Sequence, residues 1–299
     1  MRFRYLRIFV LFPVLFACAC GTISPYQPLP GAAMDKLSST DVAVPIAQSE
    51  IFVFVPASNV GAATGGGLLG ALIDAGVNDV RTTKANDASK TLRDALIDFN
   101  FDNVLQADLK ASLSQVALLH ADNVHVIKEV TSDNLDHVLD ASKAAAVLFA
   151  TTEYHVSNDG DVLSVILSAA LFPRSDELKA LVKSSNSGPK TLLTNALYRN
   201  VFTFETKAPG ATGDRDHDMA AWSADHGAPM RAALTMATAK LSAMLAADIQ
   251  RPAGATGDTG APVKVDERPG TIVGSDADGT VVRFADGTMI FATQSELRP

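Results

Sequence analysis

The sequence predicts an α/β (α+β) fold in which helices cover one face of a mixed sheet of about five strands, with a small C-terminal β appendage. Three observations lead to this prediction. Runs of β-branched and aromatic residues alternate along the chain with segments that have the three-and-four spacing of amphipathic helices. Hydrophobic residues make up 47% of the 299 residues and charged residues only 19%, which is enough for a sizeable core. A stretch rich in Pro, Gly and Thr at 251–262 separates the last helical pattern from the appendage.

The first 17 residues have the features of a signal peptide. Three arginines, Arg2, Arg4 and Arg7, precede an apolar run over residues 8–15. This run is too short to span a bilayer. The two cysteines of the chain, Cys18 and Cys20, follow directly among small residues.

This arrangement resembles the signal peptide of bacterial lipoproteins, whose lipobox ends in a cysteine that is diacylated and becomes the mature N-terminus. Cys18 has Leu15 three positions before it and fits slightly better, so we expect the lipid at Cys18, with Cys20 as the alternative. The remainder of the chain then offers no thiol for a disulfide, a metal site or a nucleophile. An ordinary cleaved signal or an uncleaved anchor is the other interpretation.

The later elements follow in order. Residues 18–49 contain four prolines and are expected to form an extended tether, or to pack in part on a main domain at 50–250. Strands are expected at 51–55 and 123–127, in a hairpin over 145–172 and at 197–206. Helices are expected at 85–99 and 105–116, from Ser132 onward, and from Pro229 to 245. After the linker at 251–262, residues 263–299 should form three short strands joined by Asp-Gly turns, packed against the main domain or a partner.

A glycine-rich apolar stretch follows the first expected strand. Its spacing matches the G-x-G-x-x-G of dinucleotide sites, but the strand ends ten positions earlier, at Val55, whereas that motif needs the strand to lead almost directly into the first glycine. No cofactor is therefore expected. The segment is either buried in the core of this domain or packs against a partner or a membrane surface. Its central residues are Gly65, Gly66, Gly67, Leu68, Leu69 and Gly70.

No set of catalytic residues can be proposed from spacing, and we expect a protein that is not an enzyme. The alternative is an envelope hydrolase or metal-dependent enzyme that uses Asp216, His217 and His226 as oxygen and imidazole ligands. Arg215 within this cluster instead favours a solvated loop without a metal. Residues 276–279 begin like a calcium loop but lack the distal Glu, and are expected to form a hairpin turn.

Charge argues against nucleic acid as a partner. Removal of the three signal-peptide arginines leaves 22 basic against 33 acidic residues, a formal charge of −11. A body this acidic repels a phosphate backbone.

The order of expected elements, together with the lipidated start, resembles a group of uncharacterised lipoproteins of Gram-negative bacteria. Their periplasmic domain is similar to the amino-terminal domain of the Tol-system propeller protein and to the curli-secretion lipoprotein. The resemblance covers residues 50–250 and implies a non-catalytic binding or assembly role, with an envelope protein or a second copy as partner. In such lipoproteins an Asp after the acylated cysteine directs retention in the inner membrane. Ala19 or Gly21 stands there, so we expect the periplasmic face of the outer membrane.

Overall fold

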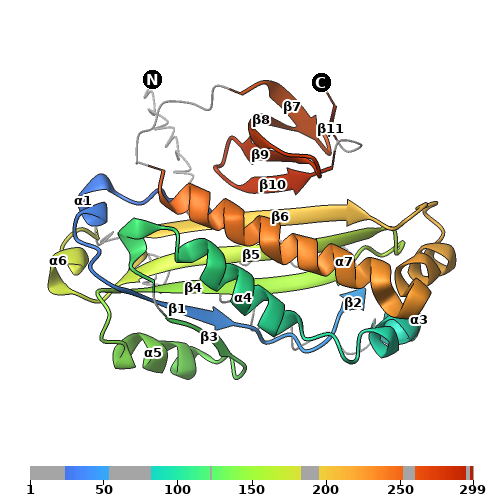
Figure 1. The fold of residues 1–299 in the computed structure, drawn as a ribbon, viewed down its shortest axis with the longest axis horizontal. Helices are drawn as coiled ribbons and strands as arrows, with labels where there is room; N and C mark the ends of the chain where they lie inside the picture. The colour runs from blue at the N-terminus through green and yellow to red at the C-terminus, as the bar shows by residue number, and fades with distance from the viewer. Residues whose placement is uncertain are drawn as a thin grey trace, which may run out of the picture.

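A computed structural model describes residues 24–53, 82–121, 123–182, 195–251, 260–293 and 297–298 (Figure 1). One sheet runs through the molecule, in the strand order β11-β7-β8-β9-β10-β6-β5-β4-β1-β3, and β2 pairs with β4 beside this path. The strands are β1 (Thr40–Pro45), β2 (Phe52–Val53), β3 (Asn123–Ile127), β4 (Ala146–Val156), β5 (Val162–Pro173), β6 (Tyr198–Lys207), β7 (Pro262–Val265), β8 (Arg268–Ser275), β9 (Thr280–Phe284), β10 (Met289–Ala292) and β11 (Leu297–Arg298).

Helices lie on both faces of this sheet. They are α1 (Gly31–Met34), α3 (Thr82–Ala95), α4 (Phe101–Leu113), α5 (Ser132–Ala141), α6 (Asp176–Lys179) and α7 (Arg215–Ile249), with a 3-10 turn, η1 (Ala117–Leu119). Figure 1 shows α4 and α7 lying across one face. Helix α5 forms a second, smaller core with β1, β4 and β5, through side chains that include Leu135, Leu139, Phe149 and Phe172. The expectation of helices on one face is therefore wrong, because alternate residues of β4 and β5 are apolar on both sides.

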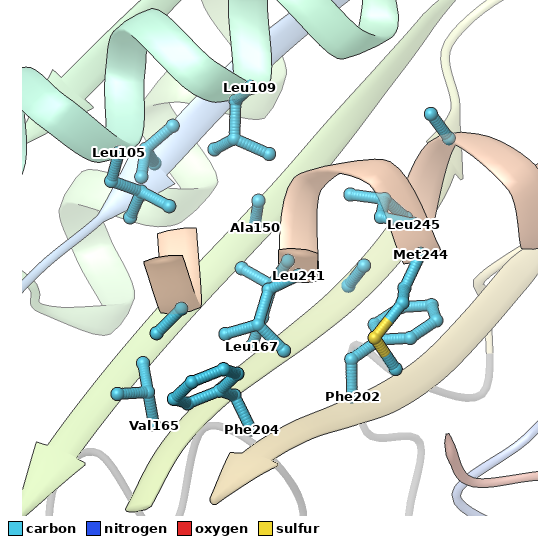
Figure 2. Packing of buried hydrophobic residues seen from close by; sticks show 14 of the residues in the cluster. Leu105, Leu109, Ala150, Val165, Leu167, Phe202, Phe204, Leu241, Met244 and Leu245 are labelled. Carbon is cyan, nitrogen blue, oxygen red and sulfur yellow. The ribbon is translucent and has the colours of Figure 1, made fainter. Parts of the chain in front are cut away.

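The main core lies between the sheet and helices α4 and α7. Figure 2 shows how Leu105 and Leu109 of α4 and Leu241, Met244 and Leu245 of α7 face Ala150, Val165, Leu167, Phe202 and Phe204 on three adjacent strands. The helical side chains recur at the three-and-four spacing and the strand side chains at every second position. Both periodicities were visible in the sequence, so the α/β class is confirmed.

The hairpin predicted over 145–172 is present as β4 and β5. Their turn contains Gly160, whose φ of +78° favours glycine. Two side chains of helix α7 hold this turn in place. Arg215 Nε donates to the Asn158 carbonyl at 2.6 Å, and Trp222 Nε1 donates to the Gly160 carbonyl at 3.0 Å.

The predicted sheet of about five strands is too small. The C-terminal strands enclose a small core of their own but also extend the main sheet, because β10 pairs in parallel with β6, with Met289 opposite Phe202 and Phe291 opposite Phe204. The rings of Phe204 and Phe291 stack at 5.6 Å between centroids. The sheet of the main domain thus continues into β10, β9, β8, β7 and β11.

A central strand lies within the segment that we expected to be a tether. Strand β1 pairs in parallel with both β3 and β4 and is almost entirely buried. This strand was not predicted, because its short apolar run, residues 42–44, follows polar residues and is ended by Pro45. The predicted extended tether over 18–49 is therefore wrong for residues 24–49. These residues pack in part on the main domain, which is the alternative that the composition left open.

Helix α7 is longer than expected and is two helices in series. Asp225, His226 and Gly227 have φ values of 49°, 58° and 75°, so the first helix ends before them and the second begins close to Pro229, as predicted. By length and composition α7 could cross a membrane, but more than half of its apolar window is buried on the core. We therefore treat it as a core helix.

Candidate functional site

Several predicted site residues lie outside the described residues. These are the two candidate lipid-attachment residues, Cys18 and Cys20, and the glycine-rich segment Gly65, Gly66, Gly67, Leu68, Leu69 and Gly70. The predictions for them stay predictions. The structure does describe the chain from residue 24 onward, only a few positions after the cysteines, and it describes Val53 and Thr82, which flank the segment that contains the glycine-rich stretch.

The first described residues are held against the start of β6. Gln27 and Arg199 form an isolated antiparallel bridge, in which each backbone N–H donates to the other carbonyl, at 2.8 and 3.0 Å. The Gln27 side chain donates to the carbonyl oxygens of Ala196 and Leu197 at 2.8 and 3.2 Å. Arg199 Nε donates to the Ser24 carbonyl at 2.7 Å. Leu29 then enters the core with no exposed surface. This stretch is therefore part of the folded body.

The same stretch contacts the C-terminal strands. Tyr26 lies against Gly287 in the β9–β10 turn, where a Cβ atom would come within 2.2 Å of the Tyr26 ring. The Arg283 guanidinium lies 5.6 Å from the centre of that ring. Because Gly287 also has a φ of +86°, this position needs glycine for two independent reasons.

A buried carboxylate completes this region. Asp248, near the end of α7, has no exposed side-chain surface and accepts hydrogen bonds from Tyr198 at 2.8 Å, Asn200 at 2.8 Å and Arg283 at 2.6 Å. Burial, with the Asp248 charge as a second cause, raises the pKa of the Tyr198 phenol well above its ordinary value, so this hydroxyl stays protonated and donates. We call residues 24–29, Tyr198, Arg199, Asn200, Asp248, Arg283 and Gly287 together the N-terminal junction.

Lys240 provides a second connection between α7 and the C-terminal strands. Its ammonium donates to Asp276 at 2.6 Å and to Asp278 at 2.7 Å, and it lies 5.0 Å from the centre of the Phe291 ring. Asp276 Oδ1 also accepts from the backbone N–H groups of residues 278 and 279. The hairpin turn expected at 276–279 is confirmed, and its carboxylates bind a lysine of this chain.

The residues of the alternative metal-site hypothesis do not converge. His217 Nδ1 lies 2.9 Å from Asp218, the next residue of the same charged cluster, whose side chain has no exposed surface. Asp218 also accepts from the backbone N–H groups of Thr212 and Gly213, and the His217 contact, followed by these bonds, lowers the pKa of Asp218 to about 2. Asp216 is exposed on the first turn of α7.

His226 lies beyond that first helical stretch, in the left-handed turn of α7. Arg231 closes this turn by donating to the carbonyls of His226 and Ala95 and to Asp98. Among the residues that the structure describes, no three His, Cys, Asp or Glu side chains are grouped so that they could hold a metal ion.

An open pocket of about 320 Å³ lies at the amino end of β1 and β4, lined by Ser38, Ser39, Ser142, Lys143, Ala144, Ala145, Arg174 and Ser175. Several of its polar groups are used within the fold. Ser142 donates to Asp41 at 2.5 Å, Ser39 accepts from the Ala145 N–H at 3.0 Å, and Arg174 pairs with Asp140 at 3.2 Å. These bonds close the loops before the strands.

Sequence reasoning missed the N-terminal junction, although two patterns pointed to it. Asp248 follows Leu241 and Leu245 on the buried face of α7, where a carboxylate needs a buried partner. Asn200 interrupts the series of large apolar side chains formed by Tyr198 and Phe202 on one face of β6. Polar residues at core positions of two elements indicate a shared hydrogen-bond network.

No protein-family model matches the chain, and no curated protein matches it. Solved structures of the PelC dodecamer from Paraburkholderia phytofirmans are similar to it at 12% sequence identity. One covers 76% of this chain and 96% of its own, with a TM-score of 0.28. A single-residue variant covers 74% and 93%, with a TM-score of 0.26. These scores are too low to support an inference about this chain.

Proposed function

We propose that this chain is a lipid-anchored protein of the periplasmic face of the outer membrane, with a non-catalytic binding or assembly role. The N-terminal junction is the observation that carries the proposal. Ser24 and Pro25 are exposed, and the chain is held on the body by four hydrogen bonds at Gln27 and one at the Ser24 carbonyl. A lipid on Cys18 or Cys20 would therefore leave the fold undisturbed, because it would precede these exposed residues.

Lipid attachment is tested on the mature N-terminus. Mass spectrometry of the purified protein should find a diacylated cysteine as its first residue. Cys18→Ala and Cys20→Ala variants should differ, because the thioether needs one particular sulfur. Only one variant should leave the membrane fraction. If both variants remain bound to the membrane with the signal intact, the lipoprotein proposal is wrong and the segment is an anchor.

The binding role predicts a partner, either an envelope protein or a second copy of this chain. Cross-linking in intact cells should trap one, whereas a solitary monomer at native abundance would contradict the role. The glycine-rich segment is the proposed contact. Leu68→Asp and Leu69→Asp should reduce the cross-linked product without changing the melting temperature, and Ile97→Asp, at an exposed position outside this segment, is the matched control.

Membrane location has its own test. Density fractionation should place the protein with outer-membrane markers, because Ala19 or Gly21 follows the acylated cysteine. Co-migration with inner-membrane markers would contradict this part of the proposal.

The enzyme alternative gains no support from the geometry. Its proposed ligands Asp216, His217 and His226 are not among any group of side chains that could hold a metal ion within the described ranges. A micromolar or tighter affinity of the purified protein for a divalent ion, lost in His217→Ala, would revive it.

A further inference from the structure

The distance between the acylated cysteine and the folded body is limited by the covalent chain. Ser24 is four residues after Cys20 and six after Cys18. A fully extended chain spans at most about 3.5 Å per residue, so the lipid attachment point lies within about 14 or 21 Å of Ser24. This limit rests on the proposed lipid attachment and on the number of residues between the acylated cysteine and Ser24.

The body is longer than this connection. Strands β4 and β6 are both antiparallel to β5, so they run in the same direction. The N-terminal junction lies at the start of β6, whereas β2 pairs with His155 and Val156 at the end of β4. Arg199, which pairs with Gln27, is in register with Ala170 and, across β5, with Phe149. Phe149 is seven residues before Val156, so about 23 Å separate the junction from the β2 end, more than the connection can reach.

We infer that the N-terminal junction faces the phospholipid headgroups of the membrane that holds the acyl chain. If the opposite end of the sheet lay against the bilayer and the junction farthest from it, the connection would have to span at least about 23 Å. The chain cannot supply it. Residues 24–29 are also fixed to the body, because Tyr26 packs on Gly287 and Leu29 is buried. They cannot detach without losing these contacts.

The surface that faces the headgroups includes the β9–β10 turn. Ala285 and Asp286 are exposed there, and Gly287 connects this turn to Tyr26. Arg268, whose side chain is 55% exposed, pairs with Asp286 at the same turn. A guanidinium at this place suits phosphate oxygens, which accept hydrogen bonds from it.

The opposite end of the body carries the contact between β2 and α3 (Figure 1). The chain leaves the described structure after Val53 and re-enters it at Thr82, at this end. A partner that binds there would therefore meet the protein on the side away from its own membrane.

The test compares two labelled positions in the full-length acylated protein. Ala285→Cys and Ile97→Cys variants are made in a background where the cysteine that is not acylated is replaced by Ser. Ala285 lies in the β9–β10 turn and Ile97, 88% exposed, follows α3. Each carries a fluorophore and is reconstituted into phosphatidylethanolamine–phosphatidylglycerol vesicles that contain a headgroup-labelled quencher. Unchanged melting temperatures show that the labels do not disturb the fold.

We expect quenching at position 285 to exceed that at 97 by at least about twofold, because about 23 Å along the strands separate the junction from the β2 end. Insertion of 24 Gly and Ser residues after residue 23 adds a mean span of about 27 Å and should abolish the difference. Equal quenching in the acylated protein without the insertion, or stronger quenching at 97, would overturn the inference alone. Absence of the acyl mass from the same sample would overturn the proposed function as well.

Discussion

Two regions attach the C-terminal strands to helix α7, and their charges lie in different surroundings. At the N-terminal junction, Asp248 has 0% and Arg283 10% of its side chain exposed, and Tyr198 and Asn200 complete the hydrogen bonding. At the second connection, Lys240 is 19% exposed, but Asp276 and Asp278 are each 49% exposed. Water can replace the lost partner only in the second region. The same kind of ion pair should therefore have unequal energetic consequences.

The largest effect is expected from Asp248→Ala. The substitution leaves the Arg283 guanidinium buried without its counter-charge, and it also removes the acceptor of Tyr198 and Asn200. The free energy of unfolding, measured by urea titration, should fall by about 3–5 kcal/mol. The control is Asp286→Ala, which removes an exposed partner of Arg268 and should cost at most about 1 kcal/mol.

A paired replacement sharpens this prediction. Asp248→Leu together with Arg283→Met removes both charges and should recover part of the lost stability, because apolar side chains can replace a buried pair, whereas Tyr198 and Asn200 still lack their acceptor. Equal losses in Asp248→Ala and the Asp286→Ala control would show that the junction is not desolvated in solution.

Gly287→Ala should have the next largest effect. The new methyl group would overlap the Tyr26 ring at a backbone φ of +86°, so we expect a loss of about 1–3 kcal/mol and faster amide exchange over residues 24–29. Gly210→Ala is the matched control, since its φ is +65° but nothing lies within 4 Å of the added carbon. If both variants lose the same stability, the Tyr26 contact contributes nothing.

Lys240→Met should cost at most about 1 kcal/mol, since it removes two half-exposed pairs and the ammonium near the Phe291 ring but keeps an unbranched apolar side chain. The loss should shrink as salt is added, because exposed pairs are screened. Lys143→Met, at an exposed position, is the control. A salt-independent loss would mean that this connection is as desolvated as the junction.

The smallest effect concerns pH. The hydrogen bond from Lys240 lowers the pKa of Asp276 below its ordinary value. A carboxyl whose folded pKa is below its unfolded pKa of about 3.9 stabilises the fold above that pH, and this contribution disappears as pH falls through the folded pKa. The difference in melting temperature between the native chain and Lys240→Met should therefore be present at neutral pH and diminish at about pH 3. A difference that grows on acidification would contradict this assignment.

Several elements were predictable because their signals are local. The alternation of apolar residues in β5, the Asn-Asp-Gly turn before it and the three-and-four spacing of α4 each depend on residues a few positions apart. These signals led to the hairpin, to β6 and to the helices of the main core. The first half of α7 was not predicted, because its start contains five charged or imidazole side chains in succession, residues 214–218, which are typical of a solvated loop.

The N-terminal junction depends on contacts that no local pattern encodes. Tyr198 and Asp248 are 50 residues apart, Asp248 and Arg283 are 35 apart, and Gln27 meets Ala196 across 169 residues. Strand β1 likewise gains its place from two parallel neighbours, since its own apolar run is short. Residue types and periodicity can say that a segment has a buried face or that a carboxylate needs a partner. Which distant residue meets that need is decided only when the whole sheet assembles, because the free energy of each pairing depends on the desolvation that all the other contacts provide.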